Sequence, residues 1–134
     1  MKKTSSAVLL IITISLMLIL SGCYKDRMLK YYNDDSIYET LDVAVLSIDE
    51  EYMEVEFLNE VHEHYTYAPF HLINCPDLKT RLNVGDIISI ITAPRFFWDN
   101  YRIPIVGITK GDIVYLEYKT GKQNLLDYIE NTQS

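Results

Sequence analysis

Hydrophobic and polar positions divide this chain into two regions with different patterns. Residues 7–20 form a nearly unbroken apolar run of 14 residues, interrupted only by Thr13 and Ser15. As a helix this run would be about 21 Å long, which is short for a membrane span of about 20 residues. From residue 41 onward the apolar runs are shorter, and turn residues separate them. The change of pattern predicts an N-terminal leader followed by one small folded domain.

The region after residue 41 has the pattern of short β-strands. Residues 41–48 are rich in apolar and β-branched side chains, and in residues 53–57 apolar positions alternate with Glu54 and Glu56. Since side chains alternate across a strand with a period of two, these two segments should form a hairpin with one solvent-exposed face. Further strands are expected at about residues 64–73, 87–92, 103–109 and 113–119.

Helical signals are fewer. Pro76 suits the first position of a short helical turn, because proline lacks the amide hydrogen that is unused there. Residues 123–130 carry leucines and Ile129 at helical spacing and predict a small amphipathic helix. Residues 24–40 show no clean alternation, so we interpret them as a tether with one helical turn around residues 28–32.

Short strands separated by frequent turns favour a mainly β fold. We expect a small antiparallel barrel of five or six strands, closed or nearly closed, with one or two short helices. The order of elements, together with residues 82–90 (LNVGDIISI), resembles an OB-fold, a family in which a hydrophobic residue followed by Gly-Asp commonly starts a barrel strand. An SH3-like barrel or a small sandwich fits the pattern nearly as well.

Directly after the apolar run, residues 20–23 read Leu-Ser-Gly-Cys. This segment resembles the lipobox of bacterial lipoproteins, whose pattern is Leu, a small residue, Gly or Ala, and an obligatory Cys. The resemblance implies that a diacylglycerol is attached to the sulfur of Cys23, that signal peptidase II cuts just before it, and that Cys23 becomes the first residue of the mature chain. The resemblance covers residues 1–23, concerns processing only, and is silent on activity.

Processing at this site sets the expected organisation and location. Residues 1–22 would be the cleaved signal peptide, residues 23–40 the lipidated cysteine and tether, and residues 41–134 the small β-barrel domain. Lys2 and Lys3 should stay on the cytoplasmic side, which directs the rest of the chain outward. Each buried methylene of an acyl chain such as palmitate contributes about 0.8 kcal/mol, so two chains would hold the domain at the cell membrane, facing the extracytoplasmic side.

The net negative charge of the mature chain limits the classes of molecule that it is expected to bind. Subtracting Lys2 and Lys3 from 12 basic residues leaves 10 against 19 acidic residues, a net charge of −9 for the mature chain with the histidines neutral. A nucleic-acid partner is not expected, because binding a polyanion requires clustered Lys and Arg, and we recognise no such cluster. An anionic leaflet also repels an anionic domain, so the lipid bilayer should be a partner only through the anchor.

All three histidines, His62, His64 and His71, lie within ten residues. On a strand His62 and His64 would point to the same face, about 7 Å apart, where two imidazoles could share a Zn or Cu ion. The alternative is that they belong to a solvated strand or loop face. Cys75 would be the only free thiol once Cys23 is lipidated, so no internal disulfide is expected and stability must come from packing.

An aromatic-rich segment follows Pro94 in the connection between two strands. Its members that could contact a ligand are Arg95, Phe96, Phe97, Trp98 and Tyr101. If these side chains are exposed, they form a platform that could stack on a sugar ring or dock an envelope protein or peptide. If they fold inward, they plug one end of the barrel.

Recognisable catalytic motifs are missing from the sequence. There is no Gly-x-Ser-x-Gly elbow, no phosphate-binding glycine loop and no known Cys-His motif. We therefore expect a membrane-anchored extracytoplasmic lipoprotein that is not an enzyme and acts as a binding or accessory module, with no cofactor beyond its covalent lipid. The alternative is a metal-binding lipoprotein that uses His62 and His64. A hydrolase of an envelope polymer is a third, less favoured hypothesis.

Overall fold

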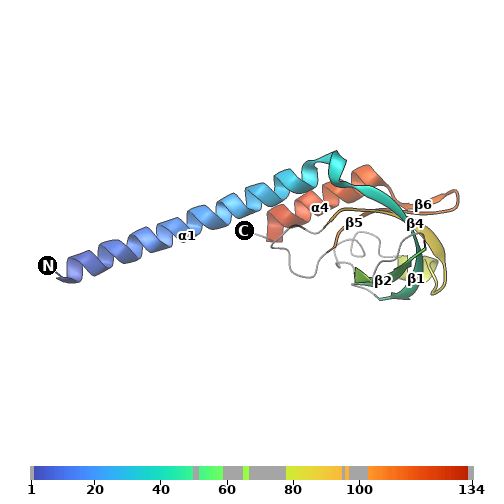
Figure 1. The fold of residues 1–134 in the computed structure, drawn as a ribbon, viewed down its shortest axis with the longest axis horizontal. Helices are drawn as coiled ribbons and strands as arrows, with labels where there is room; N and C mark the ends of the chain where they lie inside the picture. The colour runs from blue at the N-terminus through green and yellow to red at the C-terminus, as the bar shows by residue number, and fades with distance from the viewer. Residues whose placement is uncertain are drawn as a thin grey trace.

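The computed structural model describes residues 2–49, 52–58, 65–66, 78–94, 96 and 103–132. Its helices are α1 (Lys2–Asn33), the 3-10 helix η1 (Asp35–Ile37), α3 (Leu78–Arg81) and α4 (Tyr118–Thr132) (Figure 1). Its strands are β1 (Glu39–Ile48), β2 (Met53–Phe57), β3 (Tyr65–Thr66), β4 (Ile87–Thr92), β5 (Ile105–Lys110) and β6 (Ile113–Leu116). The described part of the chain is thus a mixed α/β fold, and the prediction of a mainly β protein is only partly confirmed.

The six strands form one antiparallel sheet in the order β3-β2-β1-β4-β5-β6. This confirms the predicted five or six antiparallel strands. The predicted OB-fold-like barrel is wrong, because β3 and β6 lie at opposite edges and the described strands leave the sheet open. The physical reason is that α4 packs on β5 and α1 packs on α4, and these helices supply the second layer, which a closed barrel would obtain from its own opposite wall (Figure 1).

The first hairpin follows the alternation in its sequence. β1 and β2 pair antiparallel, and along β2 the apolar side chains are buried while Glu54 and Glu56 are exposed. At the start of the turn, the carboxylate of Asp49 accepts a hydrogen bond from the backbone N–H of Tyr52 at 2.6 Å. The hydrophobic pattern alone therefore sets which face of this hairpin meets the core.

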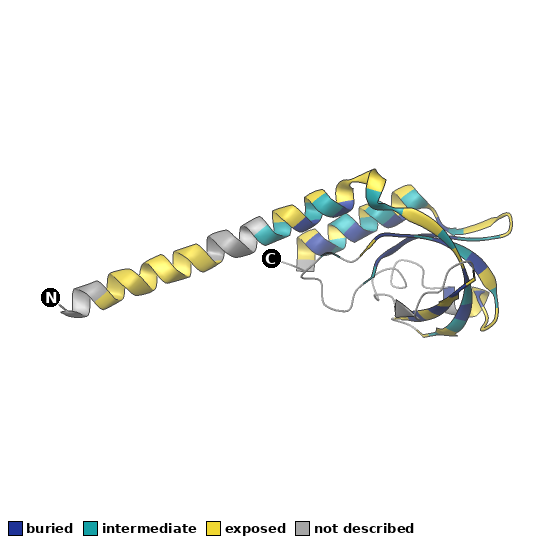
Figure 2. Cartoon of the chain, viewed as in Figure 1, coloured by how far each residue is buried: buried dark blue, intermediate teal, exposed yellow. Residues whose placement is uncertain are grey.

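Two hydrophobic clusters form the core, and Figure 2 shows the buried residues as dark bands on the sheet and on the facing helices. The sheet cluster consists of Val43, Val45, Met53, Val55, Phe57, Leu78, Leu82, Ile88, Ile90, Ile105, Ile108 and Leu116. The helix cluster consists of Met28, Tyr32, Ala93, Val106, Leu125 and Ile129. Since successive side chains of a strand point to opposite faces, Ile105 and Val106 place the two clusters on opposite sides of β5.

Helix α1 is continuous, but its two halves have different surroundings (Figure 2). The side chains of residues 6–17 are exposed, whereas Met28 and Tyr32 are buried in the helix cluster. The tether expected for residues 23–40 thus differs from the structure, in which residues 24–33 are helical and pack against α4. Within the described residues, no helix combines the length and the hydrophobicity that crossing a bilayer requires.

Helix α4 confirms the predicted amphipathic helix and extends it at both ends. It runs antiparallel to the second half of α1 (Figure 1), with Leu125 and Ile129 buried between them and the sheet. Gly121 brings α4 against β5: a Cβ atom at this position would lie 2.0 Å from the carbonyl oxygen of Val106. Glycine is required here because the helix and strand backbones are too close for any side chain.

Candidate functional site

A group of aromatic side chains lies where the second half of α1 meets the segment after β4. We call Tyr24, Tyr31, Tyr32 and Phe96 the aromatic cluster. The ring centroids of Tyr24 and Phe96 are 5.7 Å apart, those of Tyr31 and Phe96 5.3 Å, and those of Tyr31 and Tyr32 5.0 Å. Tilted and edge-to-face geometries of this kind are the favoured arrangements of aromatic pairs. The cluster therefore fixes Phe96 against two positions of α1 that are about two turns apart.

Hydrogen bonds reinforce the same contact. The hydroxyl of Tyr31 donates to the carbonyl oxygen of Pro94 at 2.8 Å, and the backbone N–H of Phe96 donates to the hydroxyl of Tyr32 at 3.1 Å. The hydroxyl of Tyr38 donates to the carbonyl oxygen of Tyr32 at 2.6 Å, near the end of α1. Burial raises the pKa of Tyr31 and Tyr38 above the ordinary tyrosine value, so both remain protonated donors at neutral pH.

The aromatic segment predicted as a ligand platform is only partly described. Phe96 is half-buried and packs on Tyr24 and Tyr31, so at this position the inward alternative is the one observed, although the surface it covers is a helix and not a barrel end. Arg95, Phe97, Trp98 and Tyr101 lie outside the described residues. Their role as a docking surface stays a prediction.

The other predicted site residues are placed as follows. His62, His64 and Cys75 lie outside the described residues, so the Zn or Cu site stays a prediction. Within the described part of the chain, no three His, Cys, Asp or Glu side chains come together as metal ligands. Cys23 lies within α1, directly before Tyr24 of the aromatic cluster, and its side chain is outside the described part.

Three basic residues of α1 were missed as a group by sequence reasoning. Lys25, Arg27 and Lys30 follow Cys23 within seven positions, and the structure places them on one continuous helix. Arg27 and Lys30 are exposed, while Lys25 is half-buried. The available signal was their close spacing after the lipobox. It was hidden by Asp26 and by the acidic balance of the whole chain.

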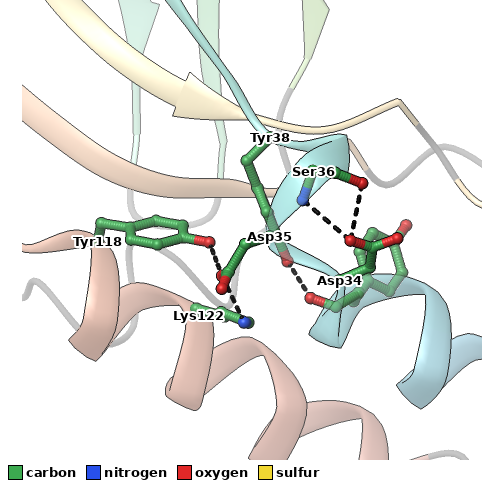
Figure 3. Close-up of polar contacts among 7 residues, drawn as sticks. Asp34, Asp35, Ser36, Tyr38, Tyr118 and Lys122 are labelled. Atoms are coloured by element: carbon green, nitrogen blue, oxygen red, sulfur yellow. Dashed lines mark hydrogen bonds and ion pairs between the residues drawn. The ribbon is translucent and has the colours of Figure 1, made fainter.

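A group of polar side chains joins η1, directly after α1, to the start of α4 (Figure 3). We call Asp35, Tyr118 and Lys122 the Asp35 clamp. One carboxylate oxygen of Asp35 accepts hydrogen bonds from the Lys122 ammonium at 2.7 Å and from the Tyr118 hydroxyl. The Tyr38 ring packs edge-on against the Tyr118 ring, with centroids 5.4 Å apart. The clamp thus holds residues more than eighty positions apart in the sequence.

The residues of the Asp35 clamp keep the same charge state near neutral pH. The hydrogen bonds from Lys122 and then Tyr118 lower the pKa of Asp35, so this carboxyl stays ionised. Burial, followed by the hydrogen bond to Asp35, raises the pKa of Tyr118 to about 12, so this phenol stays protonated. Since neither group changes its charge near neutral pH, the clamp suits structural fixation better than proton transfer.

A shallow surface pocket of about 300 Å³ adjoins the clamp. It is lined by Asn33, Asp35, Tyr118, Lys119, Lys122, Gln123 and Leu126. The Asp35 side chain is 74% exposed and that of Lys122 is 15% exposed, so the ion pair lies at the edge of solvent. Asp35 and Lys122 pair with each other, and Lys119 is the remaining charged side chain of the lining.

Comparisons with protein-family models, with curated proteins and with solved structures find no match to this chain. A functional conclusion must therefore rest on the residues and on the geometry that surrounds them. The feature with the clearest chemical meaning is the Leu-Ser-Gly-Cys segment at residues 20–23, which directly precedes the first packed residues of α1.

Proposed function

We propose that this chain is a bacterial lipoprotein, anchored to the cell membrane by acyl lipid on Cys23 and facing the extracytoplasmic side. The folded domain acts there as a non-enzymatic binding or accessory module. The support from sequence is the Leu-Ser-Gly-Cys segment at residues 20–23, placed after a basic start and an apolar run.

The observation that carries the proposal is the place where α1 begins to pack. Side chains of residues 6–17 are exposed, and Leu9 is 66% accessible. Tyr24 is the first described side chain of the helix cluster, and Tyr32 is fully buried within it. The change falls between Met17 and Tyr24, which is the interval that holds the lipobox. Cleavage before Cys23 would therefore remove none of the described core.

The same geometry determines how an anchored domain would be held. Tyr24 packs on Phe96 directly after Cys23, so little chain separates the lipid from the fold. Two acyl chains, at about 0.8 kcal/mol per buried methylene, supply enough binding free energy to keep the domain at the bilayer. A module held so close suits a task performed at the membrane surface, such as binding a neighbouring envelope protein or peptide.

Metabolic labelling with palmitate tests the attachment. The full chain is expressed in a bacterium that processes lipoproteins, as wild type, as Cys23→Ser and as Cys75→Ser. Because only Cys23 follows a lipobox, and the chain has two cysteines, label should appear in wild type and in Cys75→Ser and be lost in Cys23→Ser. Label retained in Cys23→Ser, or equal loss in both variants, would contradict the proposal.

A further inference from the structure

Charge is unevenly distributed along the mature chain that processing at Cys23 would produce. Residues 24–30 hold Lys25, Arg27 and Lys30 against Asp26, a net charge of +2. Since the mature chain carries −9, the remainder from residue 31 to residue 134 carries −11. Three of the ten basic residues of the mature chain are thus gathered in the first two helical turns after Cys23, and the acidic excess lies beyond them.

Helix α1 determines how far these three basic residues lie from Cys23 along the helix axis. At 1.5 Å per residue, Lys25, Arg27 and Lys30 lie about 3, 6 and 11 Å along the helix axis from Cys23. The interfacial layer of a bilayer is roughly 5 to 8 Å deep on each side, and long basic side chains extend several Å further. An anchor on Cys23 therefore brings Lys25 and Arg27 to the level of the lipid headgroups, with Lys30 at their outer limit.

Arg27 and Lys30 lie on the exposed side of α1. Met28 and Tyr32 face α4, and because each residue turns the helix by about 100°, Lys30 lies opposite them and Arg27 beside Lys30. The ion pairs among the described residues, Lys110 with Asp86 and Lys122 with Asp35, do not involve these side chains. Arg27 and Lys30 can therefore meet an external anion without first breaking a described ion pair.

Acidic side chains also lie at this end of the molecule. Asp26 is on α1, and Asp127 and Glu130 are exposed on the neighbouring turns of α4. Asp127 accepts a hydrogen bond from Gln123 at 2.9 Å. This end of the domain thus carries three basic side chains and Asp26 on α1, and acidic side chains on the neighbouring turns of α4.

We propose that Lys25, Arg27 and Lys30 bind the headgroups of anionic phospholipids, and that the Tyr24–Phe96 pair lies in the bilayer interface beside them. This inference rests on the proposed attachment at Cys23. Tyrosine is favoured at membrane interfaces, and basic residues close to an anionic surface add to the binding free energy of a lipid anchor. The domain would then dock on the bilayer in one orientation, although its overall negative charge predicts repulsion.

Lysine footprinting tests the docking directly. The native lipidated protein is placed in detergent, in phosphatidylcholine vesicles, and in vesicles of phosphatidylcholine with phosphatidylglycerol. A water-soluble acylating reagent then reports the reactivity of each lysine by mass spectrometry. The reactivity of Lys25 should fall about threefold or more only in the phosphatidylglycerol vesicles, and that of Lys30 less. Lys119 is the internal control, since it is exposed in the first turn of α4, at the far end of the helix pair.

A matched pair of variants separates headgroup binding from simple proximity to the membrane. Arg27→Gln should reduce the protection of Lys25 and Lys30, whereas Lys119→Gln should leave it unchanged. Equal protection in neutral and anionic vesicles would contradict recognition of anionic headgroups, and no protection in either would exclude docking. If either of these two results is obtained while the same mass spectra show an acylated Cys23, the docking proposal fails and the proposed lipid anchor does not.

Discussion

The two halves of α1 make an instructive comparison, because both are helical and both contain large apolar side chains. In the first half, residues 6–17 are apolar around the whole helix and are exposed. In the second half, Tyr24, Met28 and Tyr32 recur every four residues and belong to or pack on the helix cluster, while Asp26, Arg27 and Lys30 are exposed on the other side. The first half lacks a face that could pack on this domain, and the second half has one.

The difference shows that total hydrophobicity does not decide where a helix packs. A helix that is apolar all round has no preferred face toward a small domain, and it suits an apolar environment on every side. A helix with a narrow apolar stripe can be buried on that stripe alone. The boundary between the two patterns falls near the Leu-Ser-Gly-Cys segment at residues 20–23, as expected if the first half is a removable leader and the second half belongs to the fold.

Truncation of the central tyrosine should have the largest effect. Tyr32 is fully buried, so Tyr32→Ala should lower the free energy of unfolding by about 3–5 kcal/mol, the usual range for removing a large buried aromatic side chain. Thermal unfolding of the full-length protein in detergent, followed by circular dichroism, measures this. Leu9→Ala, in the exposed half of α1, should leave the melting temperature unchanged. Equal effects of the two substitutions would contradict the comparison.

A milder substitution keeps this test informative if Tyr32→Ala does not fold. Tyr32→Phe retains the ring and removes the hydroxyl that accepts the N–H of Phe96. The expected loss is about 1 kcal/mol, the net value of one typical hydrogen bond. A variant as stable as the wild type would mean that this hydrogen bond does not hold the segment after β4 onto α1.

An added methyl group at the contact between α4 and β5 should have an intermediate effect. Gly121→Ala places a Cβ atom against the Val106 carbonyl oxygen, so the helix must move away from the strand. We expect the free energy of unfolding to fall by about 1–3 kcal/mol, as for other overpacked sites, and the second half of α1 to pack less tightly. Urea unfolding measures the loss. Lys119→Ala, at an exposed position on the same helix, should change stability by less than about 0.5 kcal/mol.

The smallest effect concerns the Asp35 clamp and depends on pH. Because Lys122 and Tyr118 lower the pKa of Asp35 in the folded state, the clamp contributes stability above the unfolded pKa, and this is lost as the pH falls through the lower folded pKa. The wild-type melting temperature should therefore fall more steeply than that of Asp35→Asn between about pH 5 and about pH 3. Asp112→Asn, in the turn between β5 and β6, should keep the wild-type slope. Parallel curves for wild type and Asp35→Asn would show that the clamp does not stabilise the fold.

The sequence predicted the strands better than it predicted their arrangement. Alternation along residues 53–57 and the apolar run of residues 87–92 gave β2 and β4 with their observed bounds. Short strands with frequent turns predict closure into a barrel, and the interpretation of residues 24–40 as a tether does not anticipate that residues 24–33 join a helical layer on one face of the sheet. The i, i+4 stripe of Tyr24, Met28 and Tyr32 was the missed signal. Tyrosines and interleaved charges hid it.

The candidate sites were predictable only where the signal was local. Cys23 stands in a four-residue pattern that can be read without a fold. The packing of Phe96 on Tyr24 joins positions more than seventy residues apart, and the Asp35–Lys122 ion pair joins positions eighty-seven apart. No spacing rule along the chain predicts such pairs. They follow from the antiparallel packing of α1 on α4 and from the packing of α4 on β5.

Intact-mass spectrometry of the protein extracted from its native membrane tests the central claim most directly. Our account predicts a chain that begins at Cys23 and carries the added mass of a diacylglycerol, with or without a further acyl chain. A full-length chain from Met1 with an unmodified Cys23 would contradict it.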